Sequence, residues 1–307
     1  MALAEYLNEL VDVRKPLRLS RLTALSGLTP EEQELLSRRW PEIEVRRRRR
    51  LVQDLGELAE DNVELNFDAV FLVALRDPDP QVRVEAIQGL WEYEGRDLIE
   101  PLVHLLHEDN DAGVRSAAAM ALGRFALAAE FDALRPRDAA LVDRALRSVI
   151  ENPRETVEVR ARAVEAIGAR SEPWAREILE RAYRSPERRL RVSSLHAMGR
   201  SCDEHWLPTL IRELGNEDPE FRYEAATACG ALEDEGAVPY LAPLIRDEDE
   251  EVRSAAIDAL GKIGGAQARR VLREHADDED ETVREAVAAA LAQAEFQDDP
   301  MGFRYEL

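Results

Sequence analysis

The sequence predicts an all-α protein built as an α-solenoid, a linear stack of two-helix units. Along most of its 307 residues one phrase recurs: an Asp-containing turn, a large apolar residue followed by Arg, small residues, then Leu, Ile or Met and usually Gly. A fixed period of this size indicates an array in which each unit forms one supersecondary element. The copies centre on Arg83, Arg115, Arg160, Arg191, Arg222, Arg253 and Arg284, at intervals of 32, 45, 31, 31, 31 and 31 residues.

Helical spacing within each copy predicts a buried face. In residues 249–261 the apolar positions fall at i, i+4, i+7 and i+8, which is one side of an α-helix; they are Val252, Ala256, Ala259 and Leu260. Small side chains on this face let a neighbouring helix approach closely. The same small-residue position holds Ala86, Ala118, Ala163, Ser194, Ala225, Ala256 and Val287.

Each of these helices has a start signal four residues before its Arg. Asp or Thr there accepts hydrogen bonds from free backbone N–H groups, and Pro80 and Pro219 occupy the favoured first helical position. A Gly near the helix end marks either the end itself or a close contact. The start signals are Asp79, Asp111, Thr156, Glu187, Asp218, Asp249 and Asp280, and the glycines are Gly123, Gly168, Gly199, Gly230 and Gly261.

A second amphipathic segment lies between consecutive Arg-bearing helices. In the first of these segments, Leu98, Leu102, Leu105 and Leu106 show helical spacing. Two helices in each unit, joined by short turns, predict a series of αα-hairpins. The second segments are residues 97–107, 139–150, 173–183, 204–214, 237–246 and 266–275.

The phrase Asp-x-x-Val-Arg-x-x-Ala-x-x-Ala-Leu-Gly resembles the HEAT repeat, in the short variety named after phycobilisome lyases, over roughly residues 70–292. The resemblance implies a right-handed α–α superhelix in which the Arg-bearing helix is the second of each pair and lines the concave side. It also implies a ladder between adjacent units, made by the turn Asp and the helix Arg, with Thr156 replacing the Asp in the third unit. The expected ladder is Arg83, Arg115, Arg160, Arg191, Arg222, Arg253 and Arg284 with Asp79, Asp111, Asp218, Asp249 and Asp280.

The concave side is where we expect binding. Helical phase places a mixture of charges and few large apolar residues on the outward positions of the Arg-bearing helices. The predicted face consists of Glu85, Gln88, Met120, Arg124, Arg162, Glu165, His196, Arg200, Tyr223, Thr227, Asp258 and Lys262.

Three segments interrupt or flank the array. Residues 1–69 are predicted to form an irregular helical N-terminal cap, in which Thr29-Pro30-Glu31-Glu32 opens a helix as a capping box. The array occupies residues 70–296, and its longest interval contains an insertion near residues 125–138, either a binding loop or an extended helix with a longer turn. The tail, residues 297–307, either docks through Phe303 and Tyr305 or acts as a partner motif.

Charge and composition indicate the kind of binding partner and the cellular compartment. The formal net charge is −22; residues 200–307 carry 11 basic and 27 acidic side chains, net −16, whereas residues 1–50 carry 11 and 8, net +3. An acidic surface repels phosphate backbones, so we expect a basic protein partner rather than nucleic acid. Two cysteines, no signal peptide and no membrane-spanning run predict a cytoplasmic protein, and we expect a monomer.

Two clusters suggest chemistry but have simpler interpretations. Residues 46–50 are all Arg and could contact phosphate; we favour a polar helix face paired with nearby carboxylates, and expect the change Arg48→Ala to cost little stability. Cys202 and His205 supply only two of the ligands that zinc needs, even with His196, Asp203 and Glu204 nearby, so we expect no metal. His104 and His107 are equally weak candidates.

The sequence therefore predicts a non-enzymatic protein-interaction scaffold without a catalytic residue or cofactor. Two alternatives stay open. One is a chromophore lyase or another enzyme subunit, because the resembling repeats occur in bilin lyases. The other is a nucleic-acid-binding protein of the HEAT-like glycosylase kind, which requires a positive concave face.

Overall fold

A computed structural model describes residues 3–298, and the side chains of residues 3–295. These residues form α-helices joined by turns, with no β-strand among them, so the all-α prediction is confirmed. The helices are α1 (Leu3–Val11), α2 (Leu19–Leu22), α3 (Pro30–Arg39), α4 (Val45–Asp61), α5 (Asp68–Ala74), α6 (Pro80–Gly89), α7 (Ile99–Glu108), α8 (Ala112–Glu130), α9 (Pro136–Glu151), α10 (Val157–Ala166), α11 (Pro173–Tyr183), α12 (Arg188–Arg200), α13 (Leu207–Glu213), α14 (Pro219–Leu232), α15 (Val238–Leu241), α16 (Glu250–Ile263), α17 (Gly265–Glu274) and α18 (Glu281–Asp298).

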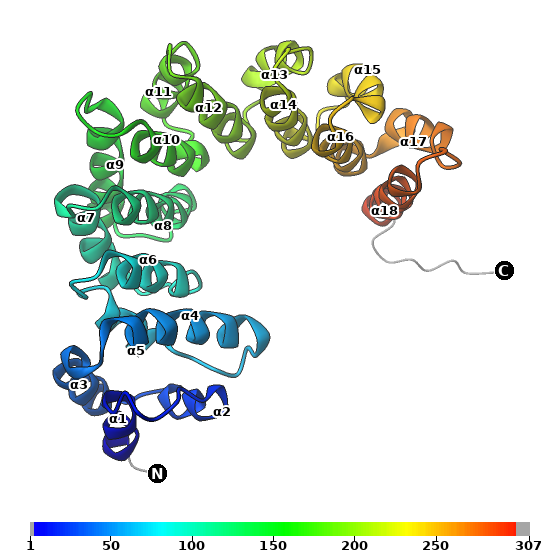
Figure 1. The fold of residues 1–307 in the computed structure, drawn as a ribbon. Helices are drawn as coiled ribbons and strands as arrows, with labels where there is room; N and C mark the ends of the chain where they lie inside the picture. Colours follow the sequence, from blue (N-terminus) through cyan, green and yellow to red (C-terminus); the bar gives the residue numbers. More distant parts are fainter. Residues whose placement is uncertain (1–2, 299–307) are drawn as a thin grey trace. The chain divides into compact units, whose positions relative to one another are not determined.

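The chain divides into two compact units. Unit 1 ends at Phe125 and resumes over Leu134–Ala163, and unit 2 comprises Ala126–Ala133 and the chain from Val164 onward. Within unit 1, α4 packs on α6, α5 packs on α6, and α7 packs on α9. Within unit 2, the hairpins α11–α12, α13–α14, α15–α16 and α17–α18 follow one another, and α12, α14, α16 and α18 lie side by side in that order (Figure 1).

Every second helix predicted between the Arg-bearing helices is present. The observed helical segments, including their 3-10 turns, lie within three residues of the predicted bounds. The stack of αα-hairpins makes the fold an α-solenoid, as predicted from the repeat period.

The predicted apolar face is the core of each hairpin. Val252, Ala256, Ala259 and Leu260 on α16 all have zero solvent exposure, and the leucines of α7 are buried as well. Because a repeat unit cannot cover this face alone, the neighbouring unit covers it, and burial extends from one hairpin to the next.

Glycines in unit 2 set the spacing between successive Arg-bearing helices. A Cβ added at Gly199 would lie 2.7 Å from the Cα of Ala228, and one added at Gly230 would lie 2.8 Å from the Cα of Ala259. Gly168 and Gly261 meet Ala197 and Ala290 in the same way. Of the two roles that the sequence left open for these glycines, close contact is the one observed at these four positions.

In unit 1, an arginine guanidinium joins consecutive hairpins. Arg83 donates from Nη1 to the carbonyl of Asp77 in its own turn (2.6 Å), and from Nε and Nη2 to the carboxylate of Asp109 in the following turn (2.8 Å each). Arg115 repeats the pattern with the carbonyl of Asp109 at 2.8 Å and the carboxylate of Glu155 at 3.0 and 2.9 Å. We call an arginine with both contacts a bridging arginine.

Unit 2 contains one bridging arginine among its described residues. Arg222 donates to the carbonyl of Asn216 at 2.9 Å and to the Asp247 carboxylate at 2.8 and 2.7 Å. Burial alone would raise the pKa of Asp247, but hydrogen bonds from Arg222 and from the backbone of Asp249 outweigh it and lower that pKa. Asp247 is therefore a carboxylate, and its paired hydrogen bonds with Arg222 are charge-assisted.

The predicted carboxylate partners of the ladder were wrong. Asp79, Asp111, Asp218, Asp249 and Asp280 instead cap their own helices, accepting backbone N–H groups at distances from 2.9 to 3.3 Å. Two of them also accept from an arginine of the preceding hairpin, Asp79 from Arg49 at 2.9 and 2.5 Å and Asp218 from Arg188 at 2.7 and 2.9 Å, but neither donor is a predicted ladder arginine.

The carboxylate that meets the bridging arginine lies two positions before the capping Asp in the turns of Asp77, Asp109 and Asp247. Each of these residues also accepts the backbone N–H of the capping residue on its Oδ1, at 2.8, 2.9 and 2.9 Å. In an Asp-x-Asp turn the first Asp therefore accepts from the bridging arginine, and the second caps the helix.

Two predicted ladder arginines lack a bridge because the next turn has no carboxylate at the required position. Arg160 donates from Nε to the carbonyl of Ile150 at 3.0 Å, and the corresponding turn residue is Ser185. Arg191 lies over the ring of Phe221, 4.7 Å from its centroid, and the corresponding turn residue is Asn216.

The last two predicted ladder arginines keep only the carbonyl contact within the described residues. Arg253 donates to the carbonyl of Asp247 at 3.0 Å, and Arg284 to that of Asp278 at 2.8 Å. The Asp278 carboxylate lies instead 3.4 Å from Nδ1 of His275.

The bridging series begins earlier than predicted, inside the N-terminal cap. Arg48 on α4 is 7% exposed, with Nε 2.6 Å from Oδ2 of Asp77, and it also donates to the carbonyl of Ile43. Trp40 donates from Nε1 to the same Asp77 carboxylate at 2.6 Å. The expectation that Arg48→Ala costs little is therefore wrong, because this side chain is buried and paired.

The start of α3 in the cap is as predicted, and the insertion follows one of its two predicted alternatives. Thr29 and Glu32 form the predicted capping box at the start of α3. The insertion is an extended α8 followed by a longer turn. Glu130, the last residue of α8, accepts from Arg170 at 2.9 Å and from the backbone of Ser171 at 3.1 Å. The predicted docking of Phe303 and Tyr305 falls outside the described residues.

Replacing Gly230 with Ala is expected to lower the free energy of unfolding by about 1–3 kcal/mol, because the new Cβ meets the backbone of α16. The control is Gly56→Ala on α4, where a Cβ meets nothing within 4 Å; it should gain up to about 1 kcal/mol from helix propensity. Urea denaturation followed by circular dichroism measures both. A gain of stability in both variants would contradict the close-contact role.

Replacing Arg48 with Ala should lower the free energy of unfolding by about 3–5 kcal/mol, because it leaves the fully buried carboxylate of Asp77 without its charged partner. The control Arg46→Ala removes an exposed side chain of the same helix and should cost about 0.5 kcal/mol or less. The same denaturation experiment compares them, and equal costs would refute the bridging role of Arg48.

Candidate binding groove

A groove in unit 1 crosses the Arg-bearing helices α6, α8 and α10 and has a volume of about 560 Å³. Its floor on α8 is made of small residues, so the backbone of that helix lies close to the groove. The lining comprises Glu60, Val84, Ile87, Gln88, Trp91, Gly113, Ser116, Ala117, Met120, Ala121, Arg124, Glu158 and Arg162.

Two large apolar side chains stand exposed in this groove. Trp91 is 59% exposed and Met120 is 54% exposed. Trp is enriched among the residues that dominate binding energy, and Met adapts its shape to different partners. The groove thus offers apolar contact area that the hairpins themselves do not use.

Arg124 supplies hydrogen-bond donors beside these apolar residues. Its Nη1 donates to the carbonyl of Trp91 at 3.1 Å, and its guanidinium carbon lies 4.9 Å from the ring centroid of Phe125. Its Nε and Nη2 are buried and have no acceptor among the described residues. Burial lowers the pKa of Arg124, yet an arginine remains charged at neutral pH. A buried charged donor without an acceptor is unfavourable, so an oxygen atom brought in by a ligand would stabilise it.

The remaining charges of the groove are mixed in sign. Arg162 donates from Nε to Glu158 at 2.8 Å, and Glu60 reaches the groove from α4. Glu85 is half-buried outside the lining, and burial, followed by the nearby charge of Glu57, raises its pKa. The lining of the groove therefore combines exposed apolar side chains with charges of both signs.

Four residues of the predicted binding face meet in this groove: Gln88, Met120, Arg124 and Arg162. In unit 2 several of the others pair locally: Glu165 accepts from Arg189 at 3.0 Å, and the Glu224 carboxylate lies 3.4 Å from Nδ1 of His196. Lys262 pairs with Asp258 at 2.7 Å. The members not yet placed are Arg200 and Tyr223, which are exposed, and Thr227, which is half-buried.

The sequence did not identify Trp91 as a binding residue. It stands at the position that Gly occupies near the helix end in five other copies, just after α6. An aromatic residue where the repeat otherwise has Gly was the available signal.

The other candidate clusters have internal partners. Arg49 donates to the Asp79 carboxylate at 2.9 and 2.5 Å, and Arg50 lies 2.7 Å from Asp54, so these members of the 46–50 run are paired as expected. His205 lies 3.9 Å from Glu180. Among the described residues, no group of three His, Cys, Asp or Glu side chains is arranged to hold a metal ion.

The chain is an α-solenoid of helical hairpins, and unit 1 carries a groove across its Arg-bearing helices. Residues 68–152 and 207–292, more than half of the chain, match the sequence profile of HEAT repeats. The chain belongs to the HEAT repeat family. No curated protein matches it.

One of three similar solved structures supports the fold. The complex of CpcE and CpcF of phycocyanin lyase from Nostoc sp. PCC7120 is 18% identical with a TM-score of 0.52, covering 91% of this chain and 95% of that chain. E. coli YibA is 19% identical with a TM-score of 0.46, covering 80% of this chain and 95% of that chain. Human deoxyhypusine hydroxylase is 22% identical with a TM-score of 0.37, covering 86% of this chain and 96% of that chain. At these identities the similarity bears on the fold alone, and only the first TM-score supports it.

The part of the chain that the structure describes contains no helix long and apolar enough to span a membrane.

Proposed function

We propose that this protein is a non-enzymatic interaction scaffold of the cytoplasm, acting as a monomer, whose unit 1 groove binds a segment of a basic protein partner. The observation that carries the proposal is the juxtaposition of exposed Trp91 and Met120 with the unpaired donors of Arg124. An indole, a thioether and a guanidinium supply contact area and hydrogen bonds, which is what binding requires.

The partner segment needs an apolar side chain and a hydrogen-bond acceptor. The apolar side chain packs against Trp91 and Met120, and a backbone carbonyl of the segment accepts from Arg124. Small residues on the α8 floor allow an extended backbone to come close enough for this contact.

The net charge of the scaffold supports a basic partner. The formal charge is −22, and this long-range field attracts a cationic protein before the groove contacts form. The charge favours encounter, whereas the apolar residues and Arg124 supply the specific contacts.

The chromophore-lyase alternative ranks second. Its support is the fold shared with the phycocyanin lyase complex at 18% identity, which does not transfer an activity. The nucleic-acid alternative is disfavoured by the acidic net charge.

A random peptide library displayed on phage and selected on the full chain tests the proposal. Selected peptides should be basic, and Trp91→Ala should weaken their binding at least about tenfold in fluorescence anisotropy, because an exposed Trp in a groove dominates binding energy. The affinity should also fall as salt rises. The control is Tyr240→Ala, which removes an aromatic side chain of similar exposure (53%) from α15.

Equal binding by the wild type and Trp91→Ala would show that the peptides use another surface and would refute the groove. Selection of acidic peptides would refute the basic partner while leaving the groove in place.

A further inference from the structure

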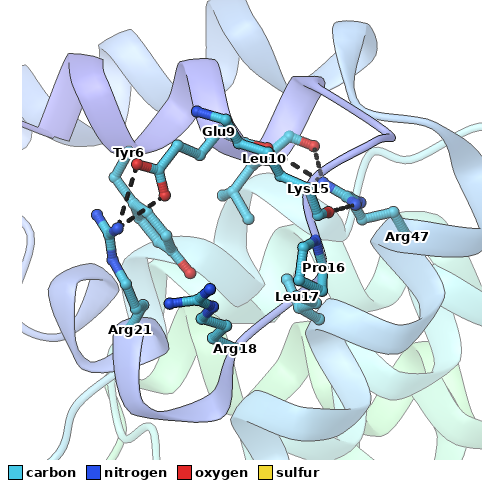
Figure 2. A pocket seen from close by; sticks show the side chains of 9 residues that line it. All are labelled: Tyr6, Glu9, Leu10, Lys15, Pro16, Leu17, Arg18, Arg21 and Arg47. Carbon is cyan, nitrogen blue, oxygen red and sulfur yellow. Dashed lines mark hydrogen bonds and ion pairs between the residues drawn. The ribbon is translucent and has the colours of Figure 1, made fainter.

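A second pocket in unit 1 lies apart from the groove, among α1, the loop after it, α2 and α4, and has a volume of about 260 Å³ (Figure 2). Its walls are unusually basic for this acidic chain. Lys15, Arg18, Arg21 and Arg47 face one carboxylate, Glu9, a formal excess of three positive charges. Residues 1–50 are also the segment of the chain with a positive balance, net +3.

Arg47 lines this pocket, and the acceptors of its guanidinium are backbone carbonyl groups. Its Nη1 donates to the carbonyls of Glu9, Leu10 and Asp12 at 3.1, 3.0 and 3.1 Å, and its Nη2 donates to the carbonyl of Lys15. Carbonyl groups carry no formal charge, so the guanidinium fixes the loop after α1 without being neutralised. This member of the 46–50 arginine run thus shapes a pocket rather than an exposed helix face.

Two of the other basic side chains remain available to a ligand. Lys15 and Arg18 are exposed, and neither side chain has a hydrogen-bond or ion-pair partner among the described residues. Arg21 pairs with Glu9 at 2.9 Å. Figure 2 shows the guanidinium of Arg18 on the same side of the pocket as the hydroxyl of Tyr6.

Tyr6 contributes a neutral donor at the base of the pocket. Its side chain is 3% exposed, and its hydroxyl is buried with no hydrogen-bond partner among the described residues. Burial, opposed in part by Arg21, raises the pKa of Tyr6 to about 12, so the hydroxyl keeps its proton at neutral pH. A buried hydroxyl without a partner is unfavourable unless an acceptor reaches it.

We propose that this pocket binds a phosphate group, with Tyr6 Oη donating a hydrogen bond and Arg18, Lys15 and Arg21 supplying positive charge. A phosphate monoester carries a charge of about −1.5 to −2 at pH 7 and accepts several hydrogen bonds, which matches three cationic side chains and one hydroxyl donor better than a single carboxylate does. The phosphate can be inorganic or carried on a protein side chain.

Titration of the full chain with inorganic phosphate at constant ionic strength, followed by calorimetry, tests this site. The wild type should bind one phosphate, and Tyr6→Phe, which keeps the buried ring, should bind about tenfold more weakly. Arg18→Gln should weaken binding by a similar factor. The control Arg38→Gln removes the same charge from α3, outside the pocket lining, and should bind as the wild type does.

No phosphate binding by the wild type up to about 10 mM would overturn the proposal. Unchanged affinity in Tyr6→Phe or in Arg18→Gln would overturn it too, as would acetate binding as tightly as phosphate. A phosphoserine peptide, compared with its unphosphorylated form, identifies the source of the phosphate. If the phosphopeptide binds more tightly than inorganic phosphate, the ligand is a phosphorylated protein. If the two bind equally, the ligand is free phosphate. Binding in the groove is measured separately, so either proposal can fail alone.

Discussion

A guanidinium placed between two consecutive hairpins is the contact on which this structure depends. Apolar burial brings helices together but is not directional, whereas a bridging arginine fixes the distance and the register between two turns through one carbonyl and one carboxylate. In unit 1, Arg48, Arg83 and Arg115 do this in sequence, and the carboxylate acceptor of one bridge supplies the carbonyl of the next. The groove crosses α6 and α8, which carry two of these arginines.

Much of this fold could be predicted from the sequence, because the repeat period, the buried stripe and the helix starts are local patterns. The ladder partners could not be predicted as well. In an Asp-x-Asp turn either carboxylate can cap the helix, and only the position of the preceding hairpin shows that Asp77 and Asp109 face it. The sequence did not reveal Arg48 as a bridging arginine, because Arg47, and not an apolar residue, precedes it in the chain.

The groove and the basic pocket were harder to predict, because they depend on which helices come together. Helical phase predicted outward-facing Met120 and Arg124, and both line the groove, but the phase could not show that Arg124 would be left with unpaired donors. The pocket of Tyr6 depends on contacts between α1 and α4, about 40 residues apart in the sequence. The arginine run at residues 46–50 did not by itself indicate a pocket, because only the packing of α1 against α4 brings Arg47 and the Tyr6 hydroxyl together.

A double-mutant cycle at Arg222 and Asp247 tests most directly whether bridging arginines couple neighbouring hairpins. Their side chains are 9% and 7% exposed, so solvent screens the pair weakly. Unfolding free energies of the wild type, Arg222→Ala, Asp247→Ala and the double variant should give a coupling energy of about 1.5–3 kcal/mol. A coupling energy within about 0.3 kcal/mol of zero would contradict the account, because the two side chains would then stabilise the stack independently.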